Sequence, residues 1–256
     1  MTIARKEERM TPKHIQQIDK NLAPKQVSGA QTLEWFPAGD PRFTMRGLAW
    51  YGENGGRFCR LPLRAEKRVR EDVWSLAECP AGARLAFCSD TSRITVRATN
   101  QDTEIMPHMP ASGSNGLILH CGAPYRMRPW ATAVPDLAEP SFMCPLYEGL
   151  DRKMREFRLY LPLYKAMISL ELGLSEGATI LPPSPPVIEK PVVFYGTSIT
   201  QGGCASTAGS DHISGVGRRL NLDVINLGFS GNGKGEPELA VLIREINASL
   251  YVIDYA

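Results

Sequence analysis

The stretch that most constrains the fold is Leu181-Pro-Pro-Ser-Pro-Pro-Val187. Proline has no backbone N–H to donate, so four prolines in five residues interrupt any helix or sheet ladder. The pattern of apolar residues also differs on the two sides of this stretch. We therefore expect a stiff linker over residues 182–190 that separates two domains.

Before the linker, short runs of apolar residues alternate with polar ones. Residues 84–88 form one short apolar run, and residues 93–98, 157–161 and 168–172 alternate between apolar and polar side chains. Glycine, proline, asparagine and aspartate separate the runs, as is typical of antiparallel strands with one face in water. These features predict a jelly-roll-like β-sandwich over residues 29–181. Residues 1–28 are polar and rich in Lys, Arg and Gln, which indicates a solvated arm.

After the linker, residues 191–256 combine continuous apolar strands with stretches of helical spacing. The expected order is strand 192–195, helix 213–220, strand 224–227, helix 239–246 and strand 250–253. Ser210 or Asp211 suits the N-cap of the first helix, and Pro237 suits the first turn of the second. A β-α-β-α-β order is typical of a parallel sheet covered on both faces. This predicts the start of a flavodoxin-like, doubly wound α/β domain.

The composition limits the kinds of binding partner and cellular location that we expect. The formal net charge is +2 over 256 residues, so the charge balance does not point to nucleic acid or to an anionic membrane. The charged N-terminus lacks the apolar core of a secretory signal, and no window suits a membrane span, so we expect a cytoplasmic protein by default. No two of the six cysteines have CxxC spacing, so we expect no metal site.

The turn Gly196-Thr-Ser-Ile-Thr-Gln-Gly-Gly203 allows two interpretations of Ser198. Serine and glycine are common in strand-to-helix turns, and Ser198 could simply cap the next helix. However, open α/β sheets bind ligands at the carboxyl ends of their strands. The second strand also ends in a glycine-rich turn, within residues 226–233. Two such turns can hold a hydroxyl nucleophile and backbone N–H donors beside one acyl carbon.

The stretch YGTSITQGG, residues 195–203, resembles the first sequence block of the SGNH (GDSL-like) hydrolases, and NLGFSGNG, residues 226–233, resembles their second block. The resemblance implies that Ser198 is the nucleophile and that the Gly231 N–H helps form the oxyanion hole. RLP at 60–62 and YLPLY at 160–164 suit the branch with an N-terminal β-domain. That branch implies a serine esterase for small-molecule or carbohydrate esters, acetyl esters among them, with no metal or organic cofactor.

The sequence departs from the family pattern in both regions. The family's Gly-x-Asp-Leu-Tyr stretch has its nearest match at Gly116-Leu-Ile-Leu-His120, where the Asp and the Tyr are absent. The third-block Asn and the Asp-x-x-His stretch have no counterparts before Ala256. We therefore expect a truncated chain that, made alone, has little esterase activity and aggregates or forms oligomers.

Several residues near these blocks have plainer interpretations. None of the four histidines, at positions 14, 108, 120 and 212, lies in an Asp-x-x-His context. Asp211 and His212 are expected to open a helix rather than to supply the general base. Asn232 fits a turn residue that tolerates positive φ, and Glu236 fits the start of the following helix.

Two alternatives to an esterase remain open at this point. One is a binding protein whose β-sandwich holds a glycan, with Trp50, Trp74 and Trp130 as stacking platforms. Tryptophan in a sandwich more often belongs to the core, because of its large apolar area. The other alternative is a degenerate or truncated product that neither binds a glycan nor hydrolyses an ester.

Overall fold

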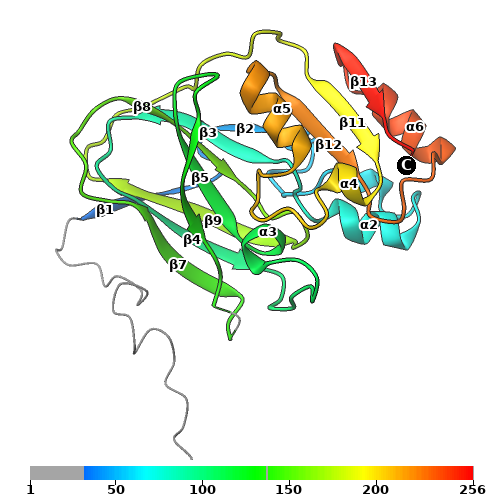
Figure 1. The fold of residues 1–256 in the computed structure, drawn as a ribbon, viewed down its shortest axis with the longest axis horizontal. Coiled ribbons are helices and arrows are strands. Elements are labelled where there is room, and N and C mark those ends of the chain that lie inside the picture. The colour runs from blue at the N-terminus through cyan, green and yellow to red at the C-terminus, as the bar shows by residue number, and fades with distance from the viewer. Residues whose placement is uncertain (1–31, 137, 256) are drawn as a thin grey trace, which may run out of the picture. The chain divides into compact units, whose positions relative to one another are not determined.

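The computed structural model describes residues 32–136 and 138–255 (Figure 1). The polar arm that we expect over residues 1–28 lies outside the described residues. In the described chain, strands predominate over helices.

The N-terminal part folds into two antiparallel sheets that share one hydrophobic core. One sheet has the strand order β1 (Leu33–Pro37), β9 (Met167–Ser175), β4 (Ile94–Asn100) and β7 (Ser141–Tyr147). The other has the order β10 (Ile180–Leu181), β3 (Arg84–Ser89), β8 (Arg155–Tyr160), β5 (Leu117–Gly122) and β6 (Arg128–Ala133), with β2 (Thr44–Arg46) paired to β3. In the core, Phe87 stacks on Phe157 with ring centroids 5.4 Å apart. Strands are therefore confirmed in all four of these runs.

The outer face of the second sheet is buried, although the alternation of its strands predicts a face in water. Arg84, Arg158 and Tyr160 are all buried. Arg84 forms an ion pair with Asp223, with 2.7 Å between Nη2 and Oδ1, and Arg158 donates to Asn221 Oδ1 at 3.0 Å. The polar face of these strands thus docks on the C-terminal part of the chain.

A β-bulge explains a second difference from the sequence prediction. Thr99 pairs with Ser169, but the next residue, Asn100, pairs with Met167, so Ile168 is skipped in the ladder. The bulge leaves Ile168 66% exposed. Ile168 therefore does not belong to the buried face of its strand.

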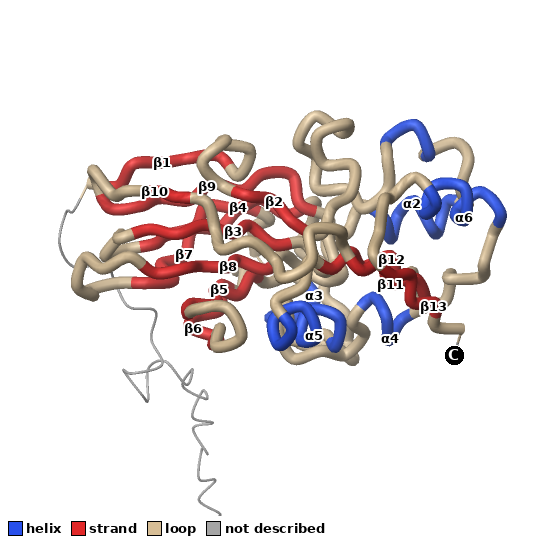
Figure 2. Tube along the Cα trace, turned by 90° about the horizontal axis from the view of Figure 1, so that it is seen from above, coloured by secondary structure: helices blue, strands red, loops and turns tan. Residues whose placement is uncertain are grey.

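The C-terminal part contains a parallel sheet in the order β12 (Val224–Gly228), β11 (Val192–Gly196) and β13 (Leu250–Ile253). The connections contain α4 (Ser198–Gln201), α5 (His212–Leu220) and α6 (Pro237–Arg244). Figure 2 shows α4 and α5 on one side of this sheet, with α6 and α2 (Glu71–Ala77) on the other. The predicted order of strands and helices is confirmed.

Alternate residues of β11 point to the two faces of the parallel sheet. Val192 shares a buried cluster with Ile213 of α5, whereas Val193 shares another with Leu239 of α6. The second cluster also includes Val73 and Trp74 of α2. The segment between β2 and β3, which contains η2 (Leu63–Ala65) and α2, therefore covers one face of this sheet. The expected division into two domains at residues 182–190 stays a prediction.

The helix ends follow the expected chemistry. Asp211 is the N-cap of α5 and accepts a hydrogen bond from the Ser214 N–H at 2.8 Å. Glu236 is the N-cap of α6, and Pro237 is its first residue. The predicted starts of both helices are confirmed.

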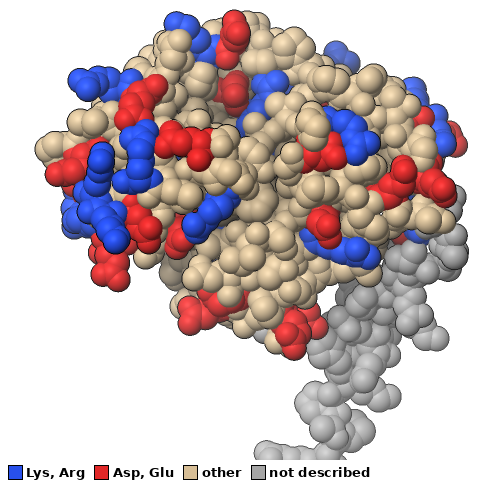
Figure 3. Space-filling view, turned by 180° about the vertical axis from the view of Figure 1, so that it is seen from behind, with Lys and Arg blue, Asp and Glu red and all other residues tan. Residues whose placement is uncertain are grey.

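No helix within 32–136 and 138–255 combines the length and apolar character needed to cross a bilayer. On the face drawn in Figure 3, Lys and Arg side chains intermingle with Asp and Glu side chains. This mixture agrees with the small net charge of +2.

Candidate active site

Ser198 lies where β11 leads into the short helix α4. The strand ends at Gly196, and Ser198 is the first residue of α4 after the N-cap Thr197. The helix stops after one turn at Gly202, whose φ of 110° favours glycine. Ser198 is half-buried, and its hydroxyl has no hydrogen-bond partner within the described residues. A free hydroxyl at the carboxyl end of a parallel strand is well placed to meet a ligand.

The turn after β12 packs directly against the Ser198 turn. Phe229 donates its N–H to the Gly196 carbonyl at 2.9 Å. A Cβ atom on Gly228 would clash with the backbone of Gln201, and one on Gly233 would clash with the Gly196 carbonyl. Glycine is needed at both positions because the two backbones approach too closely to admit a side chain.

Gly231 is an exposed residue of this second turn, with φ of 66°. The N–H groups on either side are occupied, because Ser230 donates to Gln201 Oε1 at 2.9 Å and Asn232 donates to the Phe229 carbonyl at 2.8 Å. Within the described part of the chain, the Gly231 N–H has no partner. An unused donor of this kind is what an oxyanion hole requires.

Two buried amides hold the turns in register, and the sequence analysis missed both. Gln201 donates to the Leu163 carbonyl at 3.1 Å and accepts from the Ser230 N–H. Asn226 donates to the Thr200 carbonyl at 2.8 Å. A polar residue inside the apolar strand VINLG is the signal that could have identified Asn226, because buried amides need partners.

Tyr164 brings the N-terminal part of the chain into contact with the nucleophile turn. It belongs to the stretch YLPLY, and its hydroxyl donates to the Ser198 carbonyl at 3.4 Å. Burial raises the pKa of its phenol above the ordinary value, so the group remains a neutral donor at physiological pH. The stretch that suits the family's N-terminal domain therefore contacts the turn that holds Ser198.

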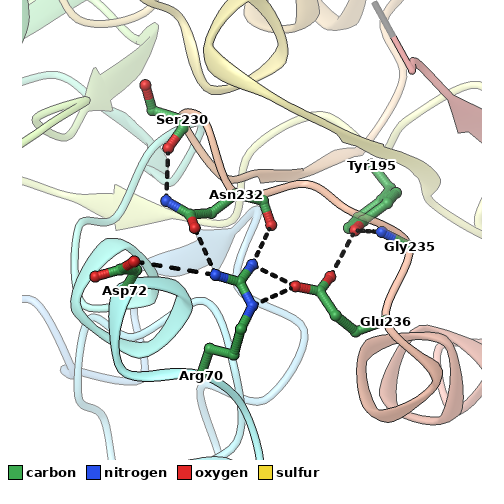
Figure 4. Close-up of polar contacts among 7 residues, drawn as sticks. All are labelled: Arg70, Asp72, Tyr195, Ser230, Asn232, Gly235 and Glu236. Atoms are coloured by element: carbon green, nitrogen blue, oxygen red, sulfur yellow. Dashed lines mark hydrogen bonds and ion pairs between the residues drawn. The ribbon is translucent and has the colours of Figure 1, made fainter.

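Arg70, the N-cap residue of α2, also holds the second turn (Figure 4). Its guanidinium donates to Asn232 Oδ1 at 2.6 Å and to the Asn232 carbonyl at 3.0 Å. Its Nε donates to Glu236 Oε1 at 2.7 Å. Tyr195 donates to Glu236 Oε2 at 3.3 Å and accepts from the Gly235 N–H at 2.7 Å.

The sequence prediction is wrong for Asn232 and confirmed for Glu236. The expected positive φ at Asn232 is wrong, because Gly231 adopts it and the Asn232 side chain instead bonds to Arg70 and to the Ser230 carbonyl. Glu236 starts α6 as predicted. Burial alone would raise the pKa of its carboxyl, but hydrogen bonds from its own backbone N–H and from Arg70 hold that pKa below the ordinary value. Glu236 is therefore an anion that anchors Arg70 at neutral pH.

None of the histidine side chains in the described residues is hydrogen-bonded to Ser198. His212 is exposed and packs edge-on against Phe194, with ring centroids 6.3 Å apart. The others are His120, buried on β5, His108, exposed in a loop, and His14, outside the described residues. The described part of the chain thus places no imidazole as a general base.

The three candidate stacking tryptophans lie in different surroundings. Trp50 and Trp74 are buried in the cluster beneath the parallel sheet, so neither offers a face to a sugar. Trp130, on β6, is 50% exposed and contacts Tyr147 with ring centroids 5.2 Å apart. Only Trp130 keeps the exposure that stacking on a glycan requires.

Within 32–136 and 138–255, no three His, Cys, Asp or Glu side chains converge in a way that could bind a metal ion. What the arrangement offers is a free serine hydroxyl on one turn and an unused backbone N–H on the turn packed against it. This pairing suits nucleophilic attack on a carbonyl carbon.

Family models match nearly the whole described chain. A model described as "N-terminus of Esterase_SGNH_hydro-type" matches residues 33–180, which is more than half of the chain. The chain belongs to the SGNH-hydrolase-type esterase family. A second model, described as "GDSL-like Lipase/Acylhydrolase family", matches residues 189–256, which contain Ser198 and Gly231. The recognition from the two sequence blocks is confirmed.

Solved structures agree with this family assignment. A putative GDSL-like lipase from Bacteroides ovatus is 28% identical with a TM-score of 0.79, and the match covers 88% of this chain and 64% of the other. The salicylyl-acyltransferase SsfX3 from a tetracycline biosynthetic pathway is 21% identical with a TM-score of 0.67, covering 87% of this chain and 62% of its own. A family two carbohydrate esterase from Cellvibrio japonicus is 12% identical with a TM-score of 0.51, covering 78% and 53%.

The chain therefore spans less than two thirds of the length of each of these structures. The last two likenesses concern the fold alone, because their sequence identity is low. A comparison with curated proteins gave no significant match.

Proposed function

We propose that this chain carries the nucleophile and part of the oxyanion hole of a serine esterase, with Ser198 as nucleophile and Gly231 as an N–H donor. The observation that supports this best is the close packing of the two glycine turns. The Phe229–Gly196 hydrogen bond of 2.9 Å holds a free hydroxyl and an unused N–H on adjacent turns. The match of residues 189–256 to the acylhydrolase model supports the same roles.

In the proposed reaction, Ser198 Oγ attacks the carbonyl carbon of an ester and its proton passes to a general base. The tetrahedral oxyanion is stabilised by backbone N–H donors that include Gly231. Collapse releases the alcohol, which takes up the proton, and leaves an acyl-serine. Water then attacks the acyl-serine by the same route, releasing the acid and restoring the hydroxyl.

We propose ester-linked acyl groups, including acetyl groups on carbohydrate, as the substrate class. The support is the family assignment together with the fold shared with a carbohydrate esterase. Because no histidine in the described residues is hydrogen-bonded to Ser198, we also propose that the 256-residue chain alone turns esters over slowly. Losing the general base should cost at least as much as losing one oxyanion donor, about 100- to 1,000-fold in rate.

The test is hydrolysis of p-nitrophenyl acetate by the protein in a form extended to include the family's Asp-x-x-His stretch. Ser198→Ala should abolish turnover. Ser206→Ala is the matched control, because Ser206 is an exposed serine on the same connection. Turnover that survives Ser198→Ala would place the nucleophile at another residue.

A further inference from the structure

Arg60 is a fully buried guanidinium that binds only backbone carbonyls among the residues described. Nε donates to the Cys79 carbonyl at 2.7 Å, and Nη2 donates to the Leu76 carbonyl at 2.6 Å. Nη1 donates to the carbonyls of Asn226 at 3.2 Å and Gly228 at 2.5 Å. The first two carbonyls lie at the end of α2, and the last two lie on β12. Arg60 therefore ties the segment between β2 and β3 to the start of the second turn.

The surroundings of Arg60 stabilise its buried charge only in this arrangement of the chain. Burial lowers its pKa to about 10, which still leaves the group charged at neutral pH. Its guanidinium also lies over the Phe229 ring, 4.8 Å from the centroid. A buried cation is costly unless its donors are satisfied, and these contacts satisfy it only while β12 and Phe229 keep their present positions.

Arg70 fixes the other end of the same turn. It binds both the carbonyl and the side chain of Asn232, and it pairs with Glu236 at the start of α6 (Figure 4). A guanidinium that donates in several directions constrains orientation as well as distance. Both ends of the turn are thus anchored by arginines from one segment of the N-terminal part.

Gly231 lies between the two anchored ends. Its N–H has no partner in the described residues, and its φ of 66° lies in the left-handed region that favours glycine. The direction of that N–H is therefore set by the residues on either side of it. Misplacement of a catalytic group by about 1 Å can cost on the order of 100-fold in rate.

We propose that Arg60 and Arg70 are positioning residues that aim the Gly231 N–H at the oxyanion. The N-terminal part then contributes to catalysis and is not only a separate binding module. This inference rests on the proposed function of Gly231 and Ser198. Neither arginine touches the substrate in this account.

The first experiment measures amide hydrogen exchange in peptides that cover residues 228–236 of the full chain. Arg70→Met should speed exchange in these peptides about tenfold or more, and Arg70→Lys should restore part of the protection. Arg64→Met is the matched control, because Arg64 belongs to the same segment but pairs with Glu53 and Glu245, away from the turn. Exchange that is equal in the Arg70 and Arg64 variants would overturn the proposal.

The second experiment separates positioning from mere stability, using a form of the protein with Ser198-dependent turnover. Arg70→Met should lower kcat about 10- to 100-fold and leave KM within about twofold, because the effect falls on the oxyanion. Arg60→Lys keeps the buried charge but loses some of the hydrogen bonds to backbone carbonyls. It should also lower kcat.

The outcomes distinguish this inference from the proposed function. A fall in kcat at constant KM, with thermal stability near wild type, supports positioning. Faster exchange with unchanged kcat overturns it and leaves the arginines a structural role. If turnover survives Ser198→Ala, the proposed function fails first, whatever the arginine variants do.

Discussion

We expect a buried histidine to make the stability of the N-terminal sheets sensitive to acid. His120 is 2% exposed, and burial together with the nearby cations Arg218 and Arg158 lowers its pKa to about 3. Its Nδ1 has no hydrogen-bond partner in the part of the chain that the structure describes. Its ring lies edge-on to Tyr160, at 5.1 Å between centroids. This residue occupies the place of the Tyr in the family's Gly-x-Asp-Leu-Tyr stretch.

The linkage predicts how stability changes with pH. The unfolded state binds a proton at His120 below about pH 6.5, whereas the folded state does not bind it until about pH 3. The free energy of unfolding should therefore fall by about 2 kcal/mol from this group alone between pH 7.5 and pH 5.

The measurement is urea denaturation at both pH values for the wild type and for His120→Phe, which keeps a ring at this position. The variant should lose about 2 kcal/mol less than the wild type over this range. An identical pH dependence in the two proteins would show that folding does not lower the pKa of His120.

At the residue scale, capping residues can be predicted from the sequence better than buried polar ones, and the reactivity of Ser198 stays a prediction. Ser198 and Asp211 stand out because each lies beside a strand or helix boundary. Arg84 and Arg60 do not, because each has partners on the C-terminal part of the chain, 139 to 168 residues away, and these contacts arise only when distant segments dock. A strand with one polar face looks the same whether that face meets water or another part of the protein.

At the scale of single elements, helix α5 contains two glycines in different environments. A Cβ atom on Gly215 would meet nothing within 4 Å, whereas one on Gly217 would lie 3.0 Å from Val224 Cγ2 on β12. Gly217 allows the helix to approach the sheet closely, and Gly215 contributes no such contact.

Two substitutions in α5 should therefore have opposite effects. Gly215→Ala should stabilise the protein by about 0.5–1 kcal/mol, because alanine has the better helix propensity. Gly217→Ala should destabilise it by about 1–3 kcal/mol, because the added methyl group crowds a packed strand. Thermal denaturation of both variants measures the difference, and equal shifts in Tm would contradict the packing described for α5.

The two outer strands of the parallel sheet are protected differently. The carbonyls of alternate residues on β12, namely Val224, Asn226 and Gly228, accept hydrogen bonds from Arg84 and Arg60. Within the described residues, β13 pairs only with β11, and nothing comparable caps its other edge. Unpaired strand edges favour association with another chain.

At the scale of the whole molecule, the β13 side is the apolar surface of the described chain that most favours association. Leu250, Ile253 and Tyr255 are all more than half exposed, and a groove of about 310 Å³ between α6 and β13 has an apolar lining. Exposed apolar patches with an open strand edge favour self-association.

We therefore expect the 256-residue chain to be oligomeric or to aggregate when made alone. Size-exclusion chromatography with light scattering should give a mass above 28.2 kDa. Ile253→Lys should shift the protein toward the monomer. Ile168→Lys is the control, because Ile168 is equally exposed but lies on the bulge of β9. A monomeric wild type would contradict the prediction.

The type and order of the strands and helices could be predicted from the sequence, but the contacts between distant elements could not. Period-two runs and the β-α-β-α-β pattern identify the antiparallel and parallel sheets, because each follows from local spacing. The docking of α2 under the parallel sheet and the bulge at Ile168 could not be predicted, because both depend on tertiary pairing. The roles of the residues that hold the candidate site, including Arg70 and Gln201, could not be predicted for the same reason.

Covalent labelling can identify the nucleophile, which we propose to be Ser198. A fluorophosphonate probe is applied to the extended form of the protein, and the modified residue is located by peptide mass spectrometry. We expect one adduct, on Ser198, that disappears in Ser198→Ala and persists in the control Ser206→Ala. An adduct on any other residue, or labelling that survives Ser198→Ala, would contradict it.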